Sequence, residues 1–342
     1  MRLLRLDHVK AGMIMMSNFE KSHHNIMIKE GTTLTDSMIN AMHRWGVNWI
    51  YVSGEIETRT ASIPEWTKVE TFEALNDEFE NIIECMKYHR DLPAKHLDQL
   101  LCRLIVELSA HKAQLFQLRE IRCIERDDFL HAYHVCVLSL MIGFRMELPF
   151  EQLRALAIGA FLHDIGKFDV HHLDCSSKPE LHHTFIGYKK LKGEPLFPLQ
   201  SSHAALMHHE HVDGSGKPRG ITSNEMHQIG KIVGIANRYD HYFRALAPFS
   251  ENDPPLQHHD VYERMVAQVG VQSDHDIFLH FLSSVVVYPT GVEVLLNTHQ
   301  HAIVIVQHPH LPSRPIIRII DSEQTLHDLS KNPKLFIIDV LT

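Results

Sequence analysis

Histidines and carboxylates gather in the middle of this chain at spacings that suit a metal-dependent hydrolase. His163 and Asp164 stand side by side at the end of an apolar run, and Lys167 follows within one helical turn. A buried charge at such a place is costly unless it is paired or bound to a metal. Other candidate ligands flank this pair on both sides: His131, His183, His208 and His209.

The chemistry that such a set favours is hydrolysis of a phosphodiester. Several imidazoles and a shared carboxylate can hold two divalent ions about 3.5–4 Å apart, which activate water and stabilise charge on the attacking and leaving oxygens. Asp164 has the two oxygens that bridging requires, and Lys167 is placed to bind phosphate. Taken alone, His131 is better explained as a structural residue and Lys167 as a solvated lysine at a helix end. The combination within one helical block favours a metal site.

Two further groups belong to this block. Asp127 stands four residues before His131, so the two side chains share one face of a helix. Asn237 and Asp240 stand one helical turn apart in the stretch IVGIANRYD. Asp240 therefore adds a second carboxylate to this block.

The elements that must position these residues are mostly helices. Residues 1–55 predict a small N-terminal α/β or β module with a regulatory role, and 56–120 predict a linker followed by amphipathic helices. Residues 121–285 form the helical block that holds the candidate site. Short β-branched runs between turns predict a small β appendage over 286–342. The expected fold class is mainly α.

Composition disfavours some classes of binding partner and some cellular locations. The formal net charge is −9, which disfavours nucleic acid as a partner. None of the five cysteines stands in a CxxC pair, so we expect reduced thiols and a cytoplasmic protein. No run approaches the roughly 18 apolar residues of a membrane-spanning helix, so we expect no membrane partner.

The order of the motifs resembles the HD-GYP family of the HD phosphohydrolase superfamily. The resemblance covers about residues 121–290 and rests on HDIGK, on HHExxDGxGxP and on the HxxxG that joins His183 to Gly187. It implies an all-helical HD-type metal-hydrolase core. It also implies a bacterial signalling phosphodiesterase that hydrolyses cyclic di-GMP to pGpG, to GMP or to both.

The resemblance also assigns roles. Asp164 would bridge two ions and act with Lys167 in catalysis, while Lys167, Lys217 and Arg244 would contact the substrate. The implied metal ligands are His131, His163, Asp164, His183, His208, His209, Asn237 and, for a further metal, Asp127. Fe or Mn suits this donor set best, and Zn, Ni or Mg is also compatible.

The chain departs from the family pattern inside the site. Lys217 replaces the tyrosine of GYP, and Arg244 is only a loose match to the family's Arg-Pro-Tyr motif. Asn237 replaces a metal-binding aspartate, and Asp240, one helical turn later, could compensate for this neutral side chain. The main hypothesis is a cyclic di-GMP phosphodiesterase whose activity is reduced by these changes. The alternative is a degenerate member that binds nucleotide or signalling proteins without turnover. A homodimer, a different nucleotide substrate and purely structural histidines also remain open.

Overall fold

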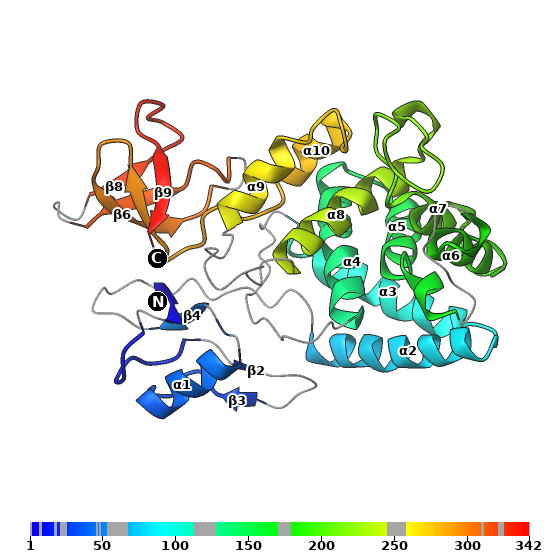
Figure 1. Cartoon of the computed structure of the whole chain (residues 1–342), viewed down its shortest axis with the longest axis horizontal. Coiled ribbons are helices and arrows are strands. Elements are labelled where there is room, and N and C mark those ends of the chain that lie inside the picture. The colour runs from blue at the N-terminus through cyan, green and yellow to red at the C-terminus, as the bar shows by residue number, and fades with distance from the viewer. Residues whose placement is uncertain are drawn as a thin grey trace.

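The computed structural model consists of a mixed N-terminal module, a central helical part and a C-terminal β-sheet (Figure 1). It describes the following ranges, with short gaps at 7–8, 17–18, 21–25, 46, 48 and 309–310: residues 2–52, 68–112, 128–169, 179–244, 258–320 and 325–341.

The N-terminal module contains two antiparallel strand pairs and one helix. Their bounds are Arg2–Arg5 (β1), Phe19–Glu20 (β2), Ile26–Ile28 (β3), Asp36–Arg44 (α1) and Trp49–Val52 (β4). β1 pairs with β4 and β2 pairs with β3. The helix begins after Thr35, whose side chain accepts a hydrogen bond from the Met38 N–H at 3.3 Å, as an N-cap does. Ile39 and Met42 are buried beneath it.

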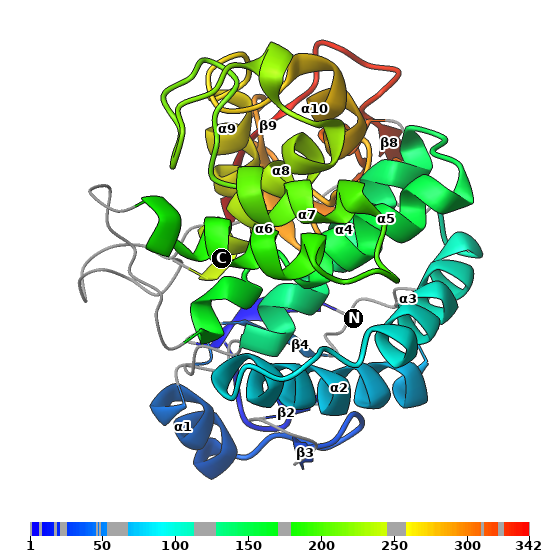
Figure 2. The same ribbon diagram turned by 90° about the vertical axis from the view of Figure 1, so that its right-hand side faces the viewer.

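The central part is a bundle around one hydrophobic core (Figure 2). Its helices are Val69–Lys87 (α2), Ala94–Ser109 (α3), Asp128–Arg145 (α4), Phe150–Phe161 (α5), His183–Lys192 (α6), Leu199–Met207 (α7), Gln228–Arg244 (α8), His258–Val266 (α9) and His275–Leu282 (α10). Short 3₁₀ helices are Ile165–Phe168 (η2), Pro179–Leu181 (η3) and Ser223–Glu225 (η4). α4 is buried around most of its circumference and packs against α5 and α8, which explains its lack of a polar face.

The C-terminal part is a five-stranded antiparallel sheet with the order β8-β7-β6-β5-β9. The strands are Glu293–Leu296 (β5), His301–Val306 (β6), Ile316–Ile319 (β7), Leu326–Asp328 (β8) and Ile337–Leu341 (β9). Val294, Val304, Ile317 and Val340 form its own core, separate from that of the helices. The β-branched runs therefore bury one face of the sheet, as strands of alternating pattern do.

The expected fold class is confirmed: a mainly helical core with a small N-terminal module and a C-terminal β part. The apolar run HDIFLHFLSSVVV predicts one helix over residues 275–287, but the helix found there, α10, is shorter. α10 ends at Leu282, because the Ser283 and Ser284 hydroxyls donate to the His280 carbonyl and three β-branched valines follow. Among the described helices, none is long and apolar enough to cross a bilayer.

Candidate metal centre

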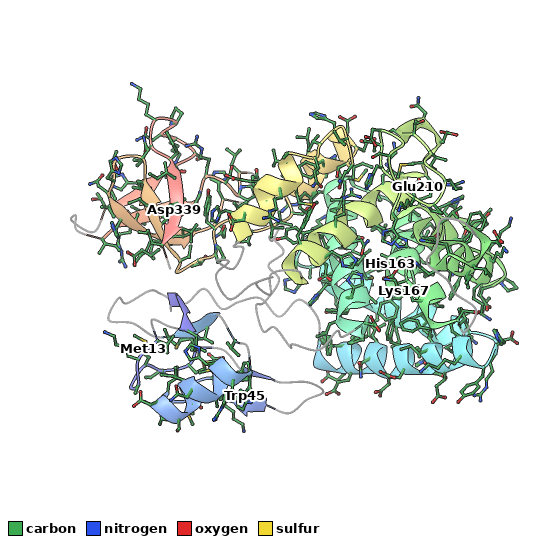
Figure 3. The ribbon with its side chains drawn as sticks, viewed as in Figure 1. Met13, Trp45, His163, Lys167, Glu210 and Asp339 are labelled. Carbon is green, nitrogen blue, oxygen red and sulfur yellow. The ribbon has the colours of Figure 1, made fainter. Side chains whose placement is uncertain are left out.

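The His163-Asp164 pair lies in the turn that follows α5. The helix ends at Phe161, and the chain then tightens into η2, where the Lys167 N–H donates to the Asp164 carbonyl at 2.9 Å. Figure 3 shows His163 and Lys167 inside the helical part, away from the other two parts. The tight turn brings the Lys167 ammonium to 2.5 Å from Asp164 Oδ2.

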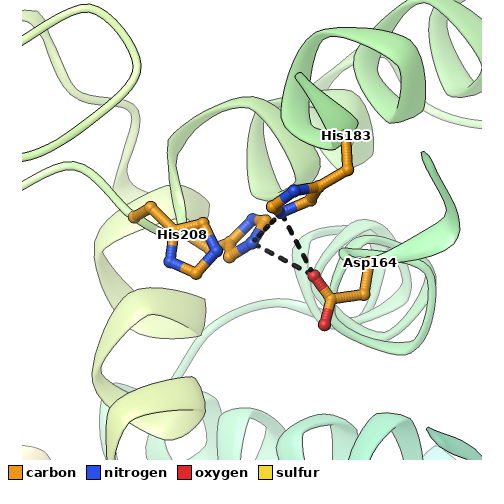
Figure 4. Close-up of side chains that lie close together, drawn as sticks. Asp164, His183 and His208 are labelled. Carbon is orange, nitrogen blue, oxygen red and sulfur yellow. Dashed lines mark hydrogen bonds and ion pairs between the residues drawn. The ribbon is translucent and has the colours of Figure 1, made fainter. Parts of the chain in front are cut away.

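Each oxygen of Asp164 faces a different pair of histidines. Oδ2 lies 3.3 Å from His163 Nε2 and 3.5 Å from His131 Nε2. Oδ1 lies 3.3 Å from His208 Nε2 and 3.4 Å from His183 Nε2, as Figure 4 shows. One carboxylate therefore joins two groups of imidazoles. One group comes from α4 and the turn after α5, and the other comes from α6 and the residue that caps α7.

The distances within each pair suit one metal ion. Two ligand atoms about 2.1 Å from an ion, at 90–110° to each other, lie about 3.0–3.4 Å apart. The Nε2 atoms of His131 and His163 are 3.1 Å apart, and those of His183 and His208 are 3.3 Å apart. Asp164 Oδ1 is buried, and its nearest charged or polar neighbours in the described part of the chain are the ring nitrogens of His208 and His183. Two sets of donor atoms each fall within 4.8 Å of one another: Asp164, His183, His208 and His209, and His131, His163 and Asp164.

Backbone carbonyls set the tautomers of two of these histidines. His163 Nδ1 is 2.8 Å from the Ala160 carbonyl, and His208 Nδ1 is 3.0 Å from the Ala204 carbonyl. A carbonyl only accepts hydrogen bonds, so each Nδ1 carries the proton. The Nε2 lone pair of each neutral ring is then free to bind a metal.

Burial and neighbouring charges keep most of the donor set deprotonated. Burial lowers the pKa of His208 to about 3 and also strongly lowers the pKa of His209. Burial would raise the pKa of Asp164, but His163 and hydrogen bonds from its histidine neighbours hold that pKa well below its ordinary value. His131 differs, because two carboxylates outweigh its burial and raise its pKa. A metal would therefore compete with a proton more strongly at His131 than at His208 or His209.

The lowered histidine pKa values predict how the metal-free protein responds to acid. Between pH 6.5, the ordinary histidine value, and the lowered folded value, the unfolded chain binds more protons, so the free energy of unfolding falls as pH falls. His208 alone should cost about 2 kcal/mol between pH 6.5 and about pH 5. His131 changes the free energy of unfolding only above pH 6.5, because below that pH its ring is protonated in both the folded and the unfolded chain. Urea unfolding of chelator-treated protein, followed by circular dichroism, measures the change.

A His208→Gln variant is the control for this pH response. It lacks the titrating ring, so its stability should fall less steeply over the same interval. A free energy of unfolding that stays level or rises from pH 6.5 to about pH 5 in the parent protein would contradict the prediction.

The remaining predicted residues are placed less centrally. Lys167 contacts Asp164 itself, and its side chain is 33% exposed. Lys217 has an exposed side chain, and its N–H donates to the His209 carbonyl at 3.0 Å. Asn237 is 1% exposed, and its Oδ1 has no hydrogen-bond partner in the described part of the chain. Asp127 lies outside the described residues, as does the side chain of Arg244.

Glu210 received no role in the sequence analysis, although it stands in the HHE motif. Its buried carboxylate accepts the N–H groups of Arg219 at 2.9 Å, Gly220 at 3.0 Å and Ile221 at 3.3 Å. Figure 3 places it beside the loop that follows α7. Glu210 thus closes the loop that carries Lys217. Its place in the HHE motif was the available signal, although the motif does not show which groups it binds.

Three residues near His131 were also missed or misplaced. Asp240 was considered as a substitute ligand, but it lies behind His131, with its Oδ2 2.5 Å from Nδ1. His134 contacts the other oxygen of Asp240 at 3.0 Å. The ring of His241 lies 4.8 Å from that of His131, measured between centroids. The spacing of His134 from His131 was the available signal, because residues three apart share a helix face.

Comparison with known families identifies two parts of the chain. Residues 129–242 match the HD domain, and residues 293–342 match the KOW domain associated with HD domain. The first match contains all the candidate metal ligands named above that the structure describes. The second match coincides with the C-terminal sheet.

Comparison with individual proteins gives relatives of low identity. The chain is similar to cyclic di-GMP phosphodiesterase PA4108 of Pseudomonas aeruginosa, at 23% identity over 67% of this chain and 56% of that protein. It is similar to a cyclic di-GMP phosphodiesterase of Thermotoga maritima, at 33% identity over 32% of this chain and 33% of that protein. Each match thus spans only part of the relative. Bd1817, a HDG"Y"P protein from Bdellovibrio bacteriovorus, superimposes with a TM-score of 0.45 and 14% identity, over 82% of this chain and 97% of that one.

Proposed function

We propose, from the premise that this chain carries an HD domain of the HD-GYP type, that it is a metal-dependent phosphodiesterase of cyclic di-GMP. The observation that carries the proposal is the position of Asp164, whose two oxygens each face a separate histidine pair at 3.3–3.5 Å. A single-metal or structural cluster needs no such bridge. The relatives' names supply the substrate class.

The side chains around Asp164 would have two different roles, metal binding and phosphate binding. Two divalent ions, when bound, supply Lewis acidity for water activation and for charge on the phosphate oxygens. The four histidines facing Asp164 would hold those ions through Nε2, together with His209. Lys167 pairs with Asp164 and is partly exposed, so it can turn its ammonium toward a substrate phosphate and fix its orientation.

A small hollow lies beside His131 and Asp164. It is lined by His131, Asp164 and Lys167 on the polar side, and by Phe79 and Phe168 on the apolar side. The apolar wall includes α2, which precedes the matched HD domain.

The second candidate function is nucleotide binding without turnover. Asn237 favours it, because an amide at a ligand position brings no charge. It should weaken the first metal site, which is the one beside His131 and His163, rather than the second, beside His183 and His208. On this alternative, cyclic di-GMP binding persists while no linear product appears. The two functions are separated by product analysis rather than by affinity.

We expect chromatography to show pGpG or GMP when cyclic di-GMP is incubated with protein loaded with Fe²⁺ or Mn²⁺. At limiting metal, Asn237→Asp should raise turnover on the order of tenfold, because a carboxylate binds the first ion more firmly. Asn224→Asp, an exposed change of the same charge, should not alter it. If the parent protein binds nucleotide but forms no product with any metal, while Asn237→Asp does, the chain is a receptor.

A further inference from the structure

Asp240 is a buried carboxylate that holds two imidazoles. It is 2% exposed and comes from α8, while His131 and His134 come from one face of α4, against which α8 packs. Its Oδ2 lies 2.5 Å from His131 Nδ1, and its Oδ1 lies 3.0 Å from His134 Nδ1. Both oxygens are thus occupied by ring nitrogens, so Asp240 is not placed to bind an ion directly.

The two nitrogens of His131 face opposite ways. Nδ1 meets Asp240, and Nε2 meets the first metal position, 3.1 Å from His163 Nε2 and 3.5 Å from Asp164 Oδ2. A carboxylate that accepts the Nδ1–H of a ligating histidine fixes its tautomer and ring orientation and raises the basicity of the other nitrogen. The contact therefore acts on the metal through the ring.

The contact between Asp240 and His131 matters because the first metal site contains little negative charge. Among the described candidate ligands, the only carboxylate there is Asp164, which the second site shares. Asn237, one turn before Asp240 on α8, is neutral. A divalent ion held there by imidazoles and one oxygen of a shared carboxylate would lack balancing negative charge, and an amide ligand at Asn237 would add none. Asp240 is the next carboxylate, one imidazole away.

We infer that Asp240 is a positioning residue that supplies the first metal site, through His131, with the negative charge that Asn237 does not provide. The inference rests on the metal requirement of the proposed function and not on the identity of the substrate. His134, which is 27% exposed, steadies the second oxygen of the carboxylate and stands one step further from the metal.

The test compares Asp240→Ala, Asp240→Asn and His134→Ala by titration of full-length metal-free protein with Co²⁺ against a chelator. Asp240→Ala should weaken one of two ions by about 10–100-fold and change its Co²⁺ absorption bands. Asp240→Asn should give a smaller loss, because its amide oxygen still accepts the Nδ1–H but carries no charge. His134→Ala should stay within about threefold. Asp98→Asn, which removes a carboxylate paired with Arg154 at 2.6 Å, is the control for lost stability.

The outcomes separate the inference from the proposed function. Unchanged affinity for both ions in Asp240→Ala and in Asp240→Asn overturns the inference, and so does an equal weakening of both ions. If Asp240→Ala does not fold, as judged by circular dichroism, the isosteric Asp240→Asn decides alone. If the parent protein itself binds no ion, the proposed function fails instead.

Discussion

Replacing Asp164 with asparagine is expected to reduce cyclic di-GMP hydrolysis on the order of 10³-fold and to lower the metal content from two ions per chain to one or none. The asparagine side chain would keep one carbonyl oxygen and replace the other by an NH₂ group, which has no lone pair to offer a metal. One histidine pair would then face a donor instead of a ligand. A loss of about 4 kcal/mol in transition-state stabilisation corresponds to that factor.

Elemental analysis of protein purified without chelator, together with product chromatography, measures both effects. Asp98→Asn serves as the matched control, because it also neutralises a partly buried carboxylate with a cationic partner but lies on α3, away from the histidines. It should retain two ions and full turnover. If Asp164→Asn retained two ions and hydrolysed at the parent rate, Asp164 would not bridge the site.

The candidate site could be predicted from the sequence where its residues are neighbours in the chain or belong to a motif. His163 and Asp164 are adjacent, and the structure brings His131, His183, His208 and His209 around them. Their roles as ligands remain predictions. A buried charge must be paired, and this requirement alone singled out the turn after α5, where His163 and Asp164 end an apolar run.

The rest depended on contacts between distant segments. Asp240 meets His131 across 109 residues, and only the packing of α8 on α4 decides that it faces a ring and not an ion. Glu210 could be noticed as buried, but its partners are backbone N–H groups, which no side-chain pattern reveals. The contact of Lys167 with Asp164 follows from a 3₁₀ turn, where the sequence analysis assumed an α-helical one.

The fold was predictable to the extent that its elements carry a periodic pattern. The heavily buried α4 and the alternating strands of the C-terminal sheet follow from their hydrophobic residues. The end of α10 could not be predicted in this way, because Val285, Val286 and Val287 give the same apolar pattern inside a helix or outside one. Their burial outside a helix is a tertiary outcome.

Gly166→Ala is expected to destabilise the protein by about 3 kcal/mol, because η2 crosses the first turn of α6 at backbone contact distance. A Cβ atom on Gly166 would lie 2.0 Å from the His183 carbonyl oxygen and 2.8 Å from the Gly187 nitrogen. These are main-chain atoms that cannot turn aside, so the helix or the turn must move. Since the second metal site needs His183 against Asp164, the shift should also weaken one ion.

The unfolding midpoint in urea and the metal content of the same samples test this expectation. Gly193→Ala is the matched control, because Gly193 caps α6 with a helical φ of −76° and its added Cβ would lie 3.3 Å from the nearest atom, the Lys189 carbonyl oxygen. It should change stability by less than about 1 kcal/mol. Equal midpoints for Gly166→Ala and the parent would show that η2 and α6 can separate without cost. The glycine of HDIGK would then need another explanation than the close approach that sets His183 beside Asp164.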